Sequence, residues 1–154
     1  MIQTSLSVYI RGLLPALLLT VNCMFVGIEG ANANAEGVAI HGYDPVAYFT
    51  MSQAVPGDAR HSVSHAGARW FFAKAEHKEL FIKTPAKYMP DYGGYCAYGM
   101  AWGLRVDVDP EAWEIADDRL FLMNTKEILA DDWVPERKRN IKAADDWWES
   151  RTKD

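Results

Sequence analysis

A ten-residue stretch around Cys96 constrains the fold more strongly than any other part of the chain. Residues 91–100 combine this cysteine with a pair of adjacent glycines and three tyrosines. The glycines allow backbone conformations that residues with a side chain avoid. The pattern over residues 95–102 predicts a short helix, and Gly103 predicts its end. Cys96 is therefore expected in the first turn of a helix, where the positive end of the helix dipole favours a thiolate.

The spacing along this helix predicts what surrounds the thiol. Cys96, Gly99, Met100 and Gly103 share one side, and two of these four residues have no side chain. We therefore expect the thiol to face the glycines, in part open to a cleft that Tyr43 or His41 borders. The alternative is that Cys96 is simply a small buried hydrophobic residue, because free cysteine is among the most buried residue types.

The N-terminal part of the chain, residues 1–35, has the pattern of a secretory signal peptide. Arg11 precedes an apolar run over residues 13–28, and small residues follow in an Ala-x-Ala arrangement. We expect cleavage after Ala33 or Ala35, which would release a periplasmic or secreted bacterial protein without stable membrane association. The alternative is an uncleaved membrane anchor, because the apolar run is long enough to span a bilayer.

Export changes what the cysteines can do. The sequence contains two cysteines, and cleavage would remove Cys23 and leave Cys96 alone. An odd thiol in an exported protein indicates a buried residue, a metal ligand, a reactive thiol or an intermolecular disulfide. The net charge of −5 argues against a nucleic-acid partner, because phosphate binding requires a basic surface.

The rest of the sequence predicts a small single α+β domain of β-hairpins packed by short helices. One hairpin is predicted from residues 61–65 and 68–72, and a second from residues 113–116 and 120–123. Helices are predicted at residues 75–84, 85–88, 95–102 and from 125 onward. We accordingly divide the chain into a leader (1–35), a core domain (36–124) and a C-terminal helical extension (125–154) packed on that domain.

Several motifs resemble the exported family of YHS-domain proteins, which includes selenoproteins. They are Ile40-His41-Gly42-Tyr43-Asp44-Pro45-Val46-Ala47-Tyr48-Phe49, Gly67-x-x-Trp70-x-Phe72, Pro85-x-Lys87-Tyr88 and Tyr92-Gly93-Gly94-Tyr95-Cys96-Ala97. The resemblance covers roughly the whole chain after the leader, and it implies a small α+β domain of hairpins and helices. It also places a selenocysteine variant at the position of Cys96, an exchange that favours a functional role for this residue.

The resemblance does not transfer the metal site of the family. Metal-handling YHS domains carry a cysteine directly after the Asp-Pro-Val element, where this chain has Ala47, and further cysteines near the Phe-containing helix. Here no cysteine lies between Phe72 and Phe81. What remains is Cys96, with Met100 and His41 as candidate companions. Thiolate, thioether and imidazole together suit a soft transition metal such as Cu(I).

Three functions remain open on these grounds. The first is an exported binding domain that holds a copper-like metal through Cys96. The second is a redox protein in which Cys96 is the reactive, catalytic thiol and an external thiol partner resolves it. The third is a structural or interaction domain without chemistry of its own. The sequence contains no nucleotide-binding or hydrolase motif with usable spacing, which argues against an enzyme of those classes.

The remaining polar candidates favour structural roles. His61 and His65 alternate as strand residues do, which places them about 13 Å apart and too far from each other to share a metal. His77 is predicted to be a half-exposed helix residue. Asp44 precedes Pro45 and is predicted to form a turn rather than to act as an acid catalyst.

Overall fold

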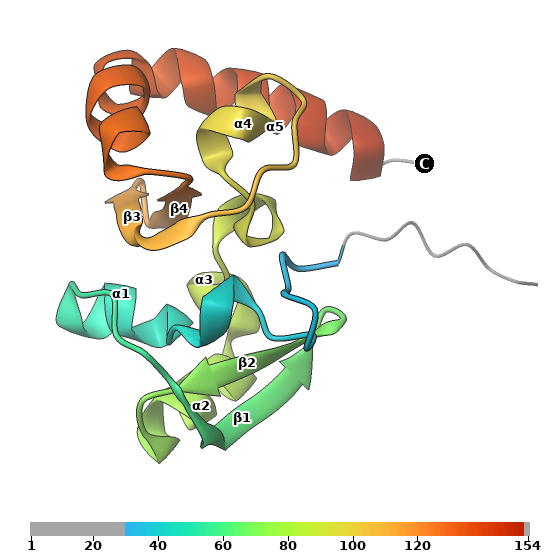
Figure 1. Cartoon of the computed structure of the whole chain (residues 1–154), viewed down its shortest axis with the longest axis vertical. Coiled ribbons are helices and arrows are strands. Elements are labelled where there is room, and N and C mark those ends of the chain that lie inside the picture. Colours follow the sequence, from blue (N-terminus) through green and yellow to red (C-terminus); the bar gives the residue numbers. More distant parts are fainter. Residues whose placement is uncertain (1–29, 153–154) are drawn as a thin grey trace, which may run out of the picture.

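The computed structural model describes residues 30–152 of the chain. Two antiparallel hairpins organise it, as predicted. Figure 1 shows one hairpin with short helices in the lower half and the other hairpin with the C-terminal helix in the upper half. The predicted α+β class is therefore confirmed.

The first half of the molecule contains the hairpin predicted around residues 66 and 67. Its elements are η1 (Ile40–Gly42), α1 (Pro45–Met51), β1 (Asp58–His65), β2 (Ala68–Phe72), α2 (Ala75–Lys83) and α3 (Pro85–Tyr88). Ala66 and Gly67 both have positive φ, 49° and 77°, which suits a two-residue hairpin turn. β1 begins three residues before the predicted strand, and a bulge shifts its register between Asp58 and Ser62.

The second half contains the predicted second hairpin and the C-terminal helices. Its elements are η2 (Asp91–Gly94), α4 (Ala97–Ala101), β3 (Asp109–Ala116), β4 (Arg119–Met123), η3 (Ile128–Trp133, a π-helix), η4 (Val134–Glu136) and α5 (Arg137–Thr152). Asp117 and Asp118 turn the hairpin with φ of 51° and 60°. Pro135 has no backbone N–H, so the regular helical bonding is interrupted there and α5 starts only at Arg137.

One side chain joins the two halves of the molecule. Tyr48 on α1 is fully buried, and its hydroxyl donates a 2.8 Å hydrogen bond to the carbonyl of Pro110 on β3. Its ring meets Trp113 edge-on at 5.2 Å between centroids. Burial and the neighbouring acidic groups raise the pKa of Tyr48 well above its ordinary value, so the phenol stays neutral. The halves therefore share one core and form a single domain.

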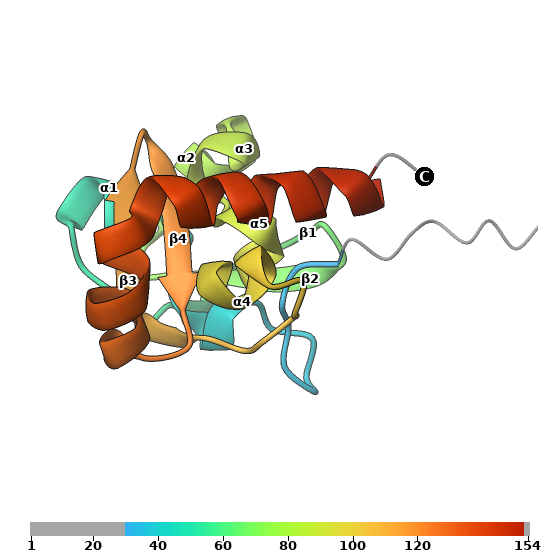
Figure 2. The same cartoon turned by 90° about the horizontal axis from the view of Figure 1, so that it is seen from above.

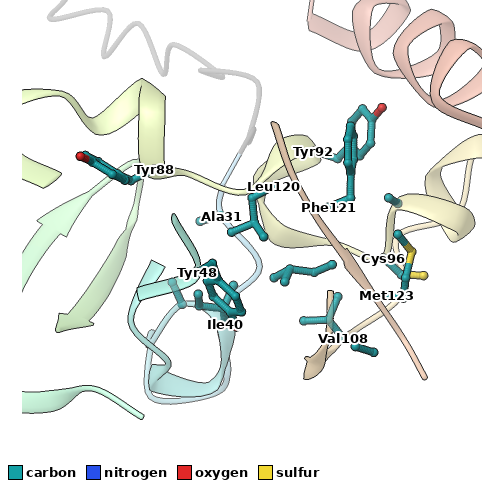
Figure 3. Packing of buried hydrophobic residues seen from close by; sticks show 14 of the residues in the cluster. Ala31, Ile40, Tyr48, Tyr88, Tyr92, Cys96, Val108, Leu120, Phe121 and Met123 are labelled. Carbon is teal, nitrogen blue, oxygen red and sulfur yellow. The ribbon is translucent and has the colours of Figure 1, made fainter. Parts of the chain in front are cut away.

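The core extends from one hairpin to the other. It contains large aromatic side chains of both halves, with Trp70 and Phe72 on β2 and Phe121 on β4. Figure 3 shows Ile40, Tyr48, Leu120 and Phe121 within this continuous cluster. Among the described residues, no helix is both long and apolar enough to cross a bilayer.

The fold begins earlier than predicted. The backbone N–H of Asn32 donates to the carbonyl of Gly93 at 2.7 Å, and the N–H of Ile40 donates to the carbonyl of Asn32 at 3.1 Å. Ala31 is buried, and Ala33 pairs with Ala39 in an isolated β-bridge. The domain therefore includes residues before the predicted boundary at 36. The rest of the predicted leader, residues 1–29, lies outside the described residues.

Candidate functional site

Cys96 lies directly before α4 and caps it. Its Sγ accepts a hydrogen bond from the N–H of Gly99 at 3.4 Å, and its own N–H donates to the carbonyl of Val106 at 2.9 Å. The predicted helix is thus present but starts at Ala97, after the cysteine. Only 1% of Cys96 is exposed. The expectation of a thiol that is partly open to a cleft is therefore wrong.

The glycines on the cysteine side of α4 explain why no cleft forms there. A Cβ placed on Gly99 would lie 3.0 Å from Cγ2 of Val106 and 3.1 Å from the carbonyl oxygen of Leu104. A Cβ on Gly103 would lie 2.5 Å from Nε1 of Trp147. The missing side chains let the following loop and α5 pack closely against α4. They do not leave the space open.

The two candidate companions of Cys96 have different surroundings. Met100 is fully buried, and Figure 3 shows Cys96 in the same apolar core as Val108 and Met123. His41, by contrast, has a 40% exposed side chain, and its Nε2 lies 3.0 Å from both carboxylate oxygens of Asp107. His41 is therefore engaged by Asp107 on the surface, whereas Cys96 points into the core.

The surface pair of His41 and Asp107 has its own support. Asn32 donates to Asp107 at 2.9 Å and so does the N–H of Val108 at 2.8 Å. Partial burial acts to raise the pKa of Asp107, but these hydrogen bonds and His41 outweigh it, so the pKa lies below its ordinary value. Among residues 30–152, no group of three or more His, Cys, Asp or Glu side chains is arranged to hold a metal ion.

The structure confirms the predicted strand position of His61 and His65 and corrects the predicted exposure of His77. His61 and His65 both lie on β1, as their alternation predicted. His77 was expected to be half-exposed, but only 2% of it is accessible. Its Nδ1 lies 2.5 Å from Asp44, and its Nε2 lies 3.2 Å from the hydroxyl of Thr50. The partner that buries His77 is 33 residues away in the sequence, which a local pattern cannot show.

A second charged cluster ties α5 to the β3–β4 hairpin. Arg119, at the start of β4, pairs with Asp91 and Asp145, and Asp145 also accepts a 2.9 Å hydrogen bond from the hydroxyl of Tyr92. Burial raises the pKa of Asp91 above its ordinary value in spite of Arg119. This cluster connects three segments of the fold, η2, β4 and α5.

Two exposed apolar side chains, Trp102 and Leu104, lie at the end of α4 beside the half-buried rings of Tyr98 and Trp147. We call Tyr98, Trp102, Leu104 and Trp147 the aromatic face. Trp102 is 67% exposed and Leu104 58% exposed, the two largest exposures among the bulky apolar residues that the structure describes. The ring of Tyr98 meets that of Trp102 edge-on at 6.3 Å. The sequence pattern placed Tyr98 and Trp102 on one side of the helix but did not show that this side faces solvent.

Two arginines lie over the aromatic rings of this region. The guanidinium of Arg151 lies 5.2 Å from the ring of Trp147. That of Arg105 lies 5.6 Å from the ring of Tyr95 and 6.0 Å from that of Trp148. Cations at such distances are attracted to the ring faces. Arg151 therefore lies over one ring of the aromatic face, and Arg105 lies over the neighbouring rings of Tyr95 and Trp148.

Comparisons with known proteins add no identification. No family model matches the chain, and no match is found among curated proteins or solved structures. The resemblance to the exported YHS-domain family thus remains a prediction from the motifs.

Proposed function

We propose that this chain is an exported binding domain of YHS type that acts through its aromatic face and has no catalytic chemistry of its own. The exposure of Trp102 supports the proposal most directly. Burying a Trp side chain removes roughly 150–250 Å² from water, so covering two thirds of one contributes on the order of 3 kcal/mol. A small domain that leaves such a residue uncovered has a surface suited to a partner.

The composition of the aromatic face also supports a contact role. Trp, Tyr and Arg are the residues that contribute most to the binding energy of interfaces. Here the ring of Trp102 meets that of Tyr98, and the next residue, Gly103, packs closely against Trp147 and fixes the backbone. A face held in this way loses little conformational entropy on binding, which favours affinity.

The copper and redox functions predicted for Cys96 receive less support from the geometry. Both require the thiol to reach a metal or an external thiol, and Cys96 is 1% exposed with its Sγ bonded to the N–H of Gly99. His41, the imidazole proposed to complete a metal site, is paired with Asp107 instead. Either function would need a local opening of α4, and the reactivity of the thiol measures that opening.

Oxidative footprinting in the native host tests whether the aromatic face is covered. Hydroxyl radicals should oxidise Trp102 readily in the purified protein and much more slowly in intact cells. Met51, which is 44% exposed on α1, provides a matched control that should react alike in both settings. Equal oxidation of Trp102 in the cell and in the purified protein would show that nothing covers this face, and the proposal would fail.

A further inference from the structure

We infer that the aromatic face rests on the surface of a phospholipid membrane, and that the apolar segment before Gly30 stays attached as the anchor. This inference rests on the proposed function, because it names the partner of the same face. It departs from the cleavage after Ala33 or Ala35 that the sequence pattern predicts. Four observations lead to it.

The first observation is that the predicted cleavage sites lie inside the folded domain. Cleavage after Ala33 would remove Asn32, whose amide donates to the carbonyl of Gly94 at 3.2 Å and to Asp107 at 2.9 Å. It would also remove the two backbone hydrogen bonds that Asn32 makes with Gly93 and Ile40. The domain keeps these bonds only if the chain is not cut at either predicted site. The contacts therefore argue against cleavage after Ala33 or Ala35.

The second observation is where the described chain begins. A Cβ on Gly93 would lie 3.3 Å from the carbonyl oxygen of Gly30 and 3.6 Å from the ring of Trp148. Gly30 therefore lies close to Trp148, the neighbour of Trp147 in the aromatic face. In Figures 1 and 2 the start of the described chain, the loop after α4 and the C-terminal end of α5 lie on the same side of the molecule.

The third observation concerns reach. The apolar run ends at about Ile28, so only Glu29 separates it from Gly30. Two residues span at most about 7 Å when fully extended. If the apolar run lies in the bilayer, the side of the domain around Gly30 must be held against the membrane surface. The aromatic face is on that side.

The fourth observation is the chemistry of the face. Trp and Tyr concentrate at the boundary between lipid and water, because each has an apolar ring with a polar group. Arg151, which lies over the ring of Trp147 in this face, is placed to meet a phosphate headgroup. The net charge of −5 does not suit attraction to an anionic surface. The contact should therefore depend on the aromatic rings and little on salt.

Fluorescence of the full chain in vesicles of phosphatidylcholine tests the inference. The emission of Trp102 is obtained as the difference between the wild type and Trp102→Phe, since the protein contains six tryptophans. Phenylalanine retains an apolar ring, so this variant should keep the same position on the membrane. Trp113→Phe, which reports a residue on β3, is the matched control.

The expected result is specific to Trp102. Brominated lipids should quench its emission, and its emission maximum should shift to the blue. Iodide in the water should quench it less in the presence of vesicles than in their absence. The Trp113 signal should not be quenched by brominated lipids, and its quenching by iodide should be the same with and without vesicles. A Trp102 signal that iodide still reaches, and that brominated lipid leaves unchanged, would overturn the inference. If footprinting nevertheless shows Trp102 covered in cells, the partner is a protein and the proposed function stands without the membrane.

Discussion

The carboxylate of Asp44 lies 2.5 Å from Nδ1 of His77, and both side chains are buried. The same carboxylate accepts hydrogen bonds from the backbone N–H groups of Val46 and Ala73, each at 2.8 Å. It thereby caps α1, holds the segment after β2 and orients α2 through His77. One buried acidic residue thus connects three elements of the first half of the domain.

Replacing Asp44 should therefore be among the most damaging single changes. In Asp44→Ala the buried His77 and three backbone N–H groups, those of Val46, Ala47 and Ala73, lose their acceptor. Breaking such a buried pair typically costs about 3–5 kcal/mol. Urea unfolding should show this loss. Asp58→Ala is the control, because Asp58 pairs with Arg60 on the surface and such a pair contributes only about 0–1 kcal/mol. Similar losses in the two variants would contradict the role given to Asp44.

The sequence allowed the local structure to be predicted but not these long-range contacts. The Asp-Pro pair indicated a turn, and alternation with turn residues indicated both hairpins, because these features depend on neighbouring residues. The burial of His77 depends on Asp44, 33 residues away, and was missed. The contacts of Asn32, which precedes the predicted boundary at residue 36, were missed for the same reason. Its partners Gly94 and Asp107 lie more than 60 residues away in the sequence.

Gly103, two residues after the end of α4, provides a second test of stability. Gly103 has a φ of 74°, and an added Cβ would meet Trp147, so Gly103→Ala should destabilise the domain by roughly 1–3 kcal/mol. Trp102→Ala should change stability by no more than about 0.5 kcal/mol, because Trp102 is largely exposed. Thermal unfolding of both variants measures the difference. A large loss in Trp102→Ala would mean that this side chain holds the fold together, not a partner.

Asp145 gives the domain a dependence on acid pH. Burial acts to raise the pKa of Asp145, but hydrogen bonds from Arg119 and Tyr92 outweigh it, and the pKa lies below its ordinary value of 3.8. The unfolded chain therefore binds protons more readily at this residue than the folded protein does. The stability contributed by Asp145 should be complete above that ordinary value and be lost as the pH falls through the lower folded pKa.

The variant Asp145→Asn isolates this contribution. Its free energy of unfolding should fall less steeply than that of the wild type below about pH 4. Asp146→Asn, on the same helix but paired only with exposed Lys142, should keep the slope of the wild type. Two variants are compared because the pH dependence of the wild type also contains a contribution from Asp91. Burial raises the pKa of Asp91, so its contribution to the slope has the opposite sign to that of Asp145. Equal slopes in both variants would refute the role of Asp145.

Burial predicts how the thiol of Cys96 behaves. In a Cys23→Ser variant, which leaves Cys96 as the only thiol, alkylation should require local opening of the fold. An opening free energy of about 3 kcal/mol would slow labelling by roughly 100-fold relative to the unfolded chain. Fast labelling of the folded protein, or a stoichiometric metal that blocks it, would instead restore the redox or copper function predicted from the sequence.

The candidate site was predictable only in part. The sequence indicated a helix near Cys96 and a shared side for Tyr98 and Trp102, because both follow from spacing along one short segment. Whether a side faces the core depends on what packs against it. Leu104 and Val106 cover the glycine side of α4, while Trp147, 44 residues beyond Gly103, closes its end. Trp102 was left outside this packing, which no local pattern could show.

Site-specific photo-cross-linking tests the central claim, that the aromatic face is the contact surface, most directly. A photoreactive residue replaces Trp102 in one variant and Val134 in the other, since Val134 is 40% exposed but lies outside the aromatic face. After irradiation of the native host, mass spectrometry identifies what is attached at each position. We predict an adduct at position 102, of lipid or protein, and none at 134. No adduct at 102, or the same adducts at both positions, would contradict the account.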